Sequence, residues 1–425
     1  MAVRRDKRTS RLGLAWRPER PAALVGSVRR RLYDRRDLRV SAALIAFVSA
    51  TAVLTASAQA LTWSVVPSRN IKPATNDNEL NAVSCVSAAA CVAVGEQAGR
   101  HANGTPVTAL IESWNGTSWS VVPSPRPGYR NALYGVSCTS AVRCTAVGAN
   151  FVDTANATAP LVESWNGTNW SVVPSPGQVG TALVGVSCVS TGACAVVGDR
   201  VSSKGHVLTF TEFWNGTRWS IVPSPSIRPG ADDNVLTGVS CVKPAACTAV
   251  GQYFFGLGHS GPLIESWNGT RWTIVPSPNR NDTGGLNGVS CASLTSCVAV
   301  GTYLGGSIVV NKTLTESWNG NRWSAGPTPK GPSQLVGASC VSATDCWAAG
   351  NSWAPAGNTR TFVEHWNGAR WAAVATPNAG PASYYDNPVA VSCAPTGSCA
   401  VAGNYGNYGL NGISKTLTMI GTPGG

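Results

Sequence analysis

The stretch "LNGVSCASLTSCVAVG", Leu286–Gly301, and the stretch "TLTESWNGNRWSAGPTP", Thr313–Pro329, together form one copy of a unit that repeats along the chain. Two cysteines with five residues between them mark each copy. Seven such pairs follow one another at steps of 49 to 53 residues, and they account for all 14 cysteines of the 425-residue sequence. A repeat of this length is typical of solenoids, propellers and arrays. The repeat therefore decides the fold.

Four short β segments can be placed on this copy, at 287–291, 297–301, 313–318 and 322–326. The chain reverses after each of the first three, and the Asn-Gly dipeptide between the last two is a strong hairpin signal. No segment of the unit has a helical hydrophobic period. Four antiparallel strands repeated every fifty residues predict an all-β fold, a seven-bladed β-propeller of four-stranded blades.

The distribution of residue size supports this architecture, because propeller blades diverge outward from a central axis. The first two segments consist of small residues, and the last two carry tryptophan pairs: Trp114/Trp119, Trp165/Trp170, Trp214/Trp219, Trp267/Trp272, Trp318/Trp323 and Trp366/Trp371. A two-residue turn would place Trp119 opposite Glu112, whereas a four-residue loop would make the two tryptophans direct partners. We interpret these pairs as filler between blades, and the alternative is a set of sugar-stacking platforms.

The two ends of the chain complement each other. The seventh copy ends in "SKTLTMIGTPGG", Ser414–Gly425, and stops one strand short. A copy of the fourth segment occurs near the other end, in "LTWSVVPS", Leu61–Ser68, and the first three segments of a unit do not precede it. We therefore expect the N-terminal strand to complete the last blade. This closure would pair two sheet edges that otherwise promote aggregation.

The segment before Leu61 has the composition of a targeting signal. Residues 1–39 hold 13 Lys and Arg against four Asp and Glu, and residues 40–60 form an uncharged run that ends in Ala58-Gln59-Ala60. We expect this run to be the apolar region of a cleaved signal peptide, with an uncleaved membrane anchor as the alternative. Residues 61–425 form the propeller region and carry a net charge of only +3, from 19 basic and 16 acidic residues. Without a basic stripe, nucleic acid is not an expected partner.

The cysteine pairs predict disulfides within the blades. Two cysteines across the mouth of a hairpin lie roughly 4.5 Å apart at their Cα atoms, which is within disulfide range. Tetrahedral zinc needs four ligands, and each blade supplies two. We expect no metal, no other cofactor, and seven bridges: Cys85–Cys91, Cys138–Cys144, Cys188–Cys194, Cys241–Cys247, Cys291–Cys297, Cys340–Cys346 and Cys393–Cys399.

The variable loops predict the binding surface. The second-to-third turns and the links between blades vary in every copy and lie on one face, and binding residues usually lie on variable loops of a rigid scaffold. The predicted ligand-binding residues are Tyr129, Tyr253, Phe254, Tyr303, Trp353, Tyr384, Tyr385, Asp232, Asp233 and Asp386. The same loops also contain Phe255, Tyr405, Tyr408 and Asp282. Aromatic and carboxylate side chains suit recognition of a glycan or a protein, and the alternative is that these loops pack on one another.

Catalytic readings of the sequence are weaker. His101, His206 and His259 lie in loops of three different blades, which favours a shared surface position over a metal site. The recurring glutamates cannot meet as a glycosidase pair, whose carboxyl groups lie within about 10 Å of each other. We expect them to hydrogen-bond within their own blades; they are Glu112, Glu163, Glu212, Glu265, Glu316 and Glu364. No catalytic residue is predicted.

The pattern "GVSCxSxxxCxAVG" with "ESWNGxxWSVVPSP" resembles the tandem repeats of exported bacterial β-propeller proteins, and it is distantly similar to kelch and tryptophan-aspartate propellers. The resemblance covers residues 61–425 and implies architecture, because propellers have many activities. The kelch double glycine and the Trp-Asp signature are absent. We expect a secreted or cell-surface monomer that binds a glycan or cell-wall polymer, with an extracellular protein-interaction scaffold second and a glycan-cleaving enzyme third.

Overall fold

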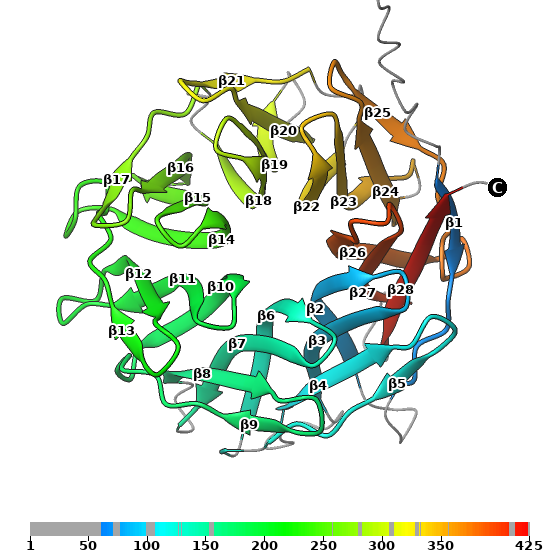
Figure 1. The fold of residues 1–425 in the computed structure, drawn as a ribbon. Helices are drawn as coiled ribbons and strands as arrows, with labels where there is room; N and C mark the ends of the chain where they lie inside the picture. Colours follow the sequence, from blue (N-terminus) through cyan, green and yellow to red (C-terminus); the bar gives the residue numbers. More distant parts are fainter. Residues whose placement is uncertain are drawn as a thin grey trace, which may run out of the picture. The chain divides into compact units, whose positions relative to one another are not determined.

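The computed structural model describes residues 61–70, 77–98, 107–125, 127–128, 130–152, 157–256, 258–278, 283–305, 310–327, 331, 333–355, 357–407 and 413–423. These residues form seven four-stranded antiparallel sheets in a ring (Figure 1). The fold is therefore a seven-bladed β-propeller, as the repeat predicts. The segments predicted at 1–39 and 40–60 lie outside the described residues. The described part of the chain contains no helix that qualifies as a membrane span.

Blades are numbered here along the chain, and the strands of each run outward from the central channel. The innermost strands of blades 1 to 7 are β2 (Asp77–Ser87), β6 (Arg130–Ser140), β10 (Thr181–Ser190), β14 (Asp233–Lys243), β18 (Gly284–Ser293), β22 (Ser333–Ser342) and β26 (Tyr384–Cys393). The second strands are β3 (Ala90–Ala98), β7 (Arg143–Phe151), β11 (Ala193–Val201), β15 (Ala246–Phe255), β19 (Ser296–Gly305), β23 (Asp345–Trp353) and β27 (Cys399–Asn407).

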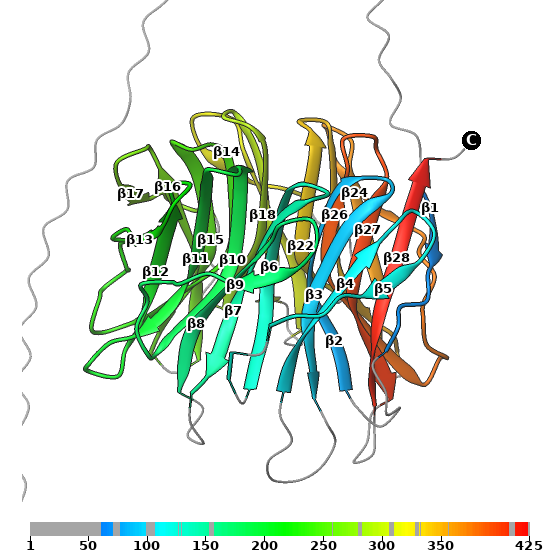
Figure 2. The same ribbon diagram turned by 60° about the horizontal axis from the view of Figure 1, so that its bottom comes forward.

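The third strands are β4 (Val107–Trp114), β8 (Thr158–Trp165), β12 (Val207–Trp214), β16 (His259–Trp267), β20 (Val310–Trp318), β24 (Thr359–Trp366) and β28 (Ser414–Pro423). The outermost strands of blades 1 to 6 are β5 (Trp119–Val121), β9 (Trp170–Val172), β13 (Trp219–Ile221), β17 (Trp272–Ile274), β21 (Trp323–Ala325) and β25 (Trp371–Val374), and that of blade 7 is β1 (Leu61–Val65). Figure 2 shows the strands running between the two faces of the ring.

The first and last described strands meet in blade 7, which confirms the predicted closure. Strand β1 pairs with β28 in antiparallel register, and Trp63 lies opposite Gly421. In Figure 1 the blue β1 lies beside the red β28. Gly421 occupies the position that a tryptophan holds in the other blades, because it pairs with Cys399 as Trp318 pairs with Cys297. The glycine leaves room for Trp63, whose ring atoms lie 3.0 Å from where a Cβ of residue 421 would stand.

A recurring bulge and a recurring glycine shape the inner strands. In every blade the ladder between the first two strands shifts by one residue, as at Asn287 between Leu286 and Gly288. Beside this bulge the backbones approach so closely that a Cβ on Gly301 would lie 2.0 Å from the carbonyl oxygen of Gly285. The last glycine of "CVAVG" is therefore required by contact with the neighbouring strand and not by a turn.

All seven predicted disulfides are present, from Cys85–Cys91 to Cys393–Cys399. The paired cysteines are direct cross-strand partners, with Cα atoms 4.0 Å apart in the first bridge. Seven bridges in one chain indicate an oxidising compartment. The turns between the cysteines and the Asn-Gly loops share one face of the ring, named here the disulfide face. The opposite face, which carries the variable loops, is named the loop face.

The serine before each cysteine links neighbouring blades. Ser84 Oγ accepts a hydrogen bond from the backbone N–H of Cys138 at 3.0 Å, and Ser137 accepts one from Cys188 at 3.0 Å. The same bond recurs at every junction, through Ser187, Ser240, Ser290, Ser339 and Ser392. The Ser-Cys dipeptide of the repeat therefore joins the seven innermost strands into a closed ring.

The tryptophan pairs are direct partners, so the four-residue loop is the correct alternative. Trp114 lies opposite Trp119, with ring centroids 5.6 Å apart. Within the loop, Asn115 Oδ1 accepts hydrogen bonds from the N–H groups of Thr117 and Ser118, and Gly116 has a φ of 96°. Trp119 is buried in a cluster that contains Leu80 of its own blade and Ile420 of blade 7. The outer tryptophans thus fill the space between blades.

Five of the six recurring glutamates accept a hydrogen bond from a serine that leaves the preceding blade, so the expectation of bonds within the blade was wrong for these five. Neither carboxylate oxygen of Glu364 has a hydrogen-bond partner among the described residues. The hydroxyl of Ser124, in the segment that leaves blade 1, donates to Glu163 Oε1 of blade 2 at 3.0 Å. Ser175 and Ser224 donate in the same way to Glu212 and Glu265. The serine of "VVPSP" therefore donates a hydrogen bond to the glutamate of the next blade. Burial raises the pKa of Glu163 to about 7, and the Ser124 hydrogen bond opposes that shift.

Candidate binding crevices between the blades

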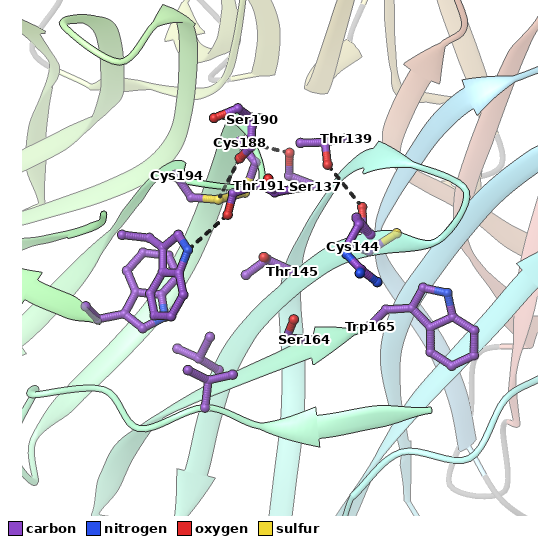
Figure 3. Close-up of a pocket in the computed structure, with 15 residues that line it drawn as sticks. Ser137, Thr139, Cys144, Thr145, Ser164, Trp165, Cys188, Ser190, Thr191 and Cys194 are labelled. Atoms are coloured by element: carbon purple, nitrogen blue, oxygen red, sulfur yellow. Dashed lines mark hydrogen bonds between the residues drawn. A yellow bond between two sulfur atoms is a disulfide. The ribbon is translucent and has the colours of Figure 1, made fainter. Parts of the chain in front are cut away.

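A crevice with a volume of about 190 Å³ lies on the disulfide face between blades 2 and 3. Thr145 and Ser164 of blade 2 lie between Trp165 on one side and Thr191 and Cys194 of blade 3 on the other (Figure 3). Trp214 and Trp219 of blade 3 complete the lining, with apolar atoms of Val162 and Val173. The crevice thus combines aromatic and aliphatic surface with hydroxyl groups, as ligand sites commonly do.

Equivalent crevices lie at two further junctions. The crevice between blades 4 and 5 has a volume of about 120 Å³ and is lined by residues that include Thr248, Ser266 and Trp318, at the positions of Thr145, Ser164 and Trp214. The crevice between blades 1 and 2 has a volume of about 250 Å³ and includes Val92 and Ser113. The repeat therefore presents similar sites side by side on one face.

One position distinguishes these three open junctions from the junction between blades 3 and 4. In the three open junctions the residue before the first tryptophan of the earlier blade is a serine: Ser113, Ser164 or Ser266. In blade 3 this residue is Phe213, whose ring lies 4.6 Å from that of Trp267 in blade 4. A phenylalanine at this position therefore fills the junction that a serine leaves open.

Blade 6 fills its junction with blade 7 by a different set of residues. His365 replaces the serine, and Trp347 stands where Thr145 stands in blade 2. Their rings stack with centroids 4.3 Å apart. The indole N–H of Trp347 donates a hydrogen bond to Asp345 Oδ1, and His365 Nε2 is hydrogen-bonded to the same oxygen. Trp347 also packs edge-on against Trp63 of β1, at 5.6 Å. Aromatic rings thus fill the junction that holds the closing strand.

The polar groups of the open crevices fall into two sets. Most indole N–H groups of the first tryptophans are engaged: Trp214 donates to the Thr191 carbonyl at 3.1 Å, and Trp318 donates to that of Leu294 at 3.1 Å. These bonds fix the rings against the turns between the cysteines. The hydroxyl groups of Thr145 and Ser164, in contrast, have no hydrogen-bond partner among the described residues and are free for a ligand.

The carboxylates predicted as ligand groups on the loop face make hydrogen bonds and ion pairs within the protein. Asp386 is fully buried and accepts hydrogen bonds from the N–H groups of Ala379 and Gly380 at 2.8 and 3.1 Å, beside the guanidinium of Arg360. Asp232 pairs with Arg228 at 2.7 Å. Asp233 accepts from the N–H of Val207 at 2.9 Å. These three side chains brace the chain segments that carry the loops.

The aromatic residues predicted on the loop face do not form one cluster. Tyr253 stacks on Phe255, and Phe255 stacks on His259, all within the β15–β16 hairpin. Phe254 lies on the other side of that strand and is 41% exposed. The others that the structure describes are half-buried: Tyr303, Trp353, Tyr384, Tyr385 and Tyr405. Tyr129, Tyr408, Asp282 and His101 lie outside the described residues.

The innermost strands enclose a central channel of about 520 Å³. The bulge residue of every blade contributes to its lining, and these residues are Asn81, Tyr134, Val184, Thr237, Asn287, Val336 and Val389. No charged residue is among the lining residues. Among the described residues, no group of three or more His, Cys, Asp or Glu side chains is placed to hold a metal ion.

The variability of the sequence indicates the loop face and gives no indication of the crevices on the disulfide face. The available signal was small: "ESW" in the open junctions against "EFW" in blade 3 and "EHW" in blade 6. This difference indicates open and filled junctions only when it is known that these side chains of the third strands face the next blade. The ligand-binding role of the loop-face residues remains a prediction.

No family model matches the chain, and no curated protein matches it. Solved structures do. A structure described as YCF48 bound to D1 peptide has a TM-score of 0.50 at 12% identity, and the match covers 84% of this chain and 96% of that chain. YCF48 from Cyanidioschyzon merolae has a TM-score of 0.48 at 12% identity, covering 84% of this chain and 98% of that one. The α-L-arabinofuranosidase Arb93A from Fusarium graminearum, in complex with an iminosugar inhibitor, has a TM-score of 0.45 at 10% identity, covering 86% and 98%. At these identities the similarity shows the fold alone.

Proposed function

We propose that this propeller is a secreted or cell-surface binding module for glycan or cell-wall polymer, and that successive sugar units occupy the crevices on its disulfide face. The observation that carries the proposal is the recurrence of one kind of crevice at three junctions. A polymer with a repeating unit suits a surface with repeating sites, because linked weak contacts add to a high overall affinity.

The lining of the crevices supports a sugar as the ligand. The half-buried rings of Trp214 and Trp318 offer apolar surface to the C–H side of a pyranose, as aromatic side chains do at binding surfaces. The free hydroxyl groups of Thr145 and Ser164 can exchange hydrogen bonds with sugar hydroxyls. The disulfides support an extracellular location, where polysaccharides are accessible.

The test uses the natural variation between junctions. Ser164→Phe and Ser266→Phe copy Phe213 and should close two crevices without loss of folding, because blade 3 accommodates phenylalanine at this position. Retention of the oxidised protein on insoluble polysaccharide and cell-wall material is measured together with released sugar. We expect wild-type retention without release and a clear loss of retention in the double variant. The crevice between blades 1 and 2 stays open in this variant, so undiminished retention after closure of the other two would contradict the proposed multivalent site, and sugar release would indicate an enzyme.

A second candidate is a protein-interaction scaffold on the loop face. Exposed apolar side chains occur there on blades 2 to 5, and they are Val152, Val179, Val201, Phe254 and Leu304. Exposed apolar side chains contribute to many protein contacts. A pull-down from culture medium with wild type and Phe254→Ser separates the two candidates. A protein partner lost only in Phe254→Ser would favour the scaffold, and Tyr384→Ala with Tyr385→Ala tests the remaining predicted loop residues.

A further inference from the structure

The crevice between blades 2 and 3 contains a cationic side chain, Arg143, that the two equivalent crevices lack. Arg143 precedes Cys144 and lines this crevice, and the equivalent residues in the other two crevices are Ala90 and Ala246. The side chain has a fixed position, since Nη1 donates to the carbonyl oxygens of Val142 at 3.0 Å and Asn166 at 2.7 Å.

Arg143 also has no acidic partner. Among the described residues no carboxylate lies within ion-pair distance of its guanidinium, and none of the residues that line the crevice is acidic. Nη1 is engaged with carbonyl oxygens, while Nη2 and Nε make no hydrogen bond in the described part of the chain. A guanidinium binds a carboxylate through two parallel N–H donors, and such charge-assisted bonds are stronger than neutral ones.

The rest of the lining is more polar than that of the matched crevice between blades 4 and 5. Both crevices share the two disulfides, the tryptophan pair, a threonine and a serine. Where the latter has Val242 and Leu294, the former has Thr139 and Thr191. The differences all point in one direction, toward a charged and hydroxyl-rich ligand at one junction.

We propose that the crevice between blades 2 and 3 binds a hexuronic acid unit of an acidic polysaccharide, whose carboxylate pairs with Arg143 while its ring hydroxyls contact Thr145 and Ser164. This inference rests on the proposed glycan-binding function and adds a charge preference to it. The crevice between blades 4 and 5, with Ala246 at the cationic position, accepts neutral units.

The test compares one oligosaccharide in two charge states. Tetragalacturonic acid and its methyl ester are titrated calorimetrically into the oxidised protein, because esterification removes the charge and keeps the sugar ring. We expect wild type to bind the acid about five- to tenfold more tightly than the ester, the range of one charge-assisted contact at a partly exposed site. Raising the salt concentration should reduce this preference.

Three variants locate the effect. Arg143→Ala should bind acid and ester equally, and Ala246→Arg should bind the acid more tightly than wild type does. Arg370→Ala is the matched control, an exposed arginine of the same face that lines none of the described crevices. Equal binding of acid and ester by wild type, or an acid preference that persists in Arg143→Ala, would overturn the inference and leave glycan binding intact. Failure of both ligands and of the polysaccharide retention test would overturn both proposals.

Discussion

Ser392 Oγ of blade 7 accepts a hydrogen bond at 2.8 Å from the backbone N–H of Cys85 in blade 1, across 307 positions of sequence. This bond closes the ring of serine contacts between the innermost strands. Strand β1 closes the same ring at its circumference, where Trp63 packs against Gly421 and Trp347. The seam between the two ends of the chain is therefore held at the channel and at the outer edge.

Replacing Ser392 by alanine should destabilise the protein by about 1 kcal/mol, because the Cys85 N–H loses its partner within the blade junction. Denaturant unfolding measures the difference. Ser120→Ala, at an exposed position of the outer strand β5, is the control and should change stability by less than about 0.5 kcal/mol. Equal effects of the two substitutions would show that the serine ring contributes nothing specific.

Replacing Trp63 by alanine should cost about 3 to 5 kcal/mol, the usual range for loss of a buried aromatic side chain. Trp63 is 7% exposed and completes the aromatic junction with blade 6. A weakened β1 would also expose the edge of β28, so we expect aggregation during thermal unfolding. Val121→Ala, on an outer strand and 36% exposed, should have little effect on either measurement. Wild-type stability in Trp63→Ala would contradict closure by this strand.

Stability should fall as the pH rises from about 5 to 8. Burial raises the pKa of Glu112 and Glu163 to about 7 and that of Glu265 and Glu364 to about 8, from 4.5. Between the unfolded pKa of 4.5 and the folded pKa of each glutamate, the folded protein holds more protons than the unfolded chain. A rise in pH within this range therefore favours unfolding. Above about pH 8 this effect is complete, because the groups are then ionised in both states.

The melting temperature at pH 5 and pH 8 tests this dependence, and Glu265→Gln identifies its source. Glutamine keeps the shape and the acceptor for Ser224 but does not ionise, so the pH slope of the variant should be smaller than that of wild type. A higher melting temperature at pH 8 than at pH 5 would show that these glutamates are ionised at no cost in the folded state.

Removal of one disulfide should cost about 2.4 kcal/mol, from the chain entropy of a closed loop of about seven residues. The double substitution of Cys188 and Cys194 by serine tests the bridge of blade 3, and denaturant unfolding under oxidising conditions measures the change. Full reduction of wild type should lower the melting temperature much further. An unchanged melting temperature after reduction, with free thiols verified by mass, would mean that the bridges do not stabilise the fold.

The sequence alone determined the architecture of this protein, because each copy of the unit repeats the same strand, turn and cysteine pattern. The spacing of the cysteines, the Asn-Gly loops and the unmatched strand at Leu61–Ser68 predicted the number of blades, the bridges and the closure. Those features are local: a strand, a turn or a cross-strand pair depends on residues within one copy of the unit.

Tertiary structure decided every relationship between neighbouring blades. Glu163 and Ser124 read as members of separate motifs, and only the ring brings the glutamate of one blade to the serine that leaves the blade before it. The same holds for Ser164 and Phe213, whose side chains face the next blade, so that one opens a junction and the other fills it. Such contacts join residues roughly one repeat apart, and the pattern within a repeat contains no signal for which faces meet. The fold was therefore predictable from local pattern, whereas the candidate sites depend on packing between copies.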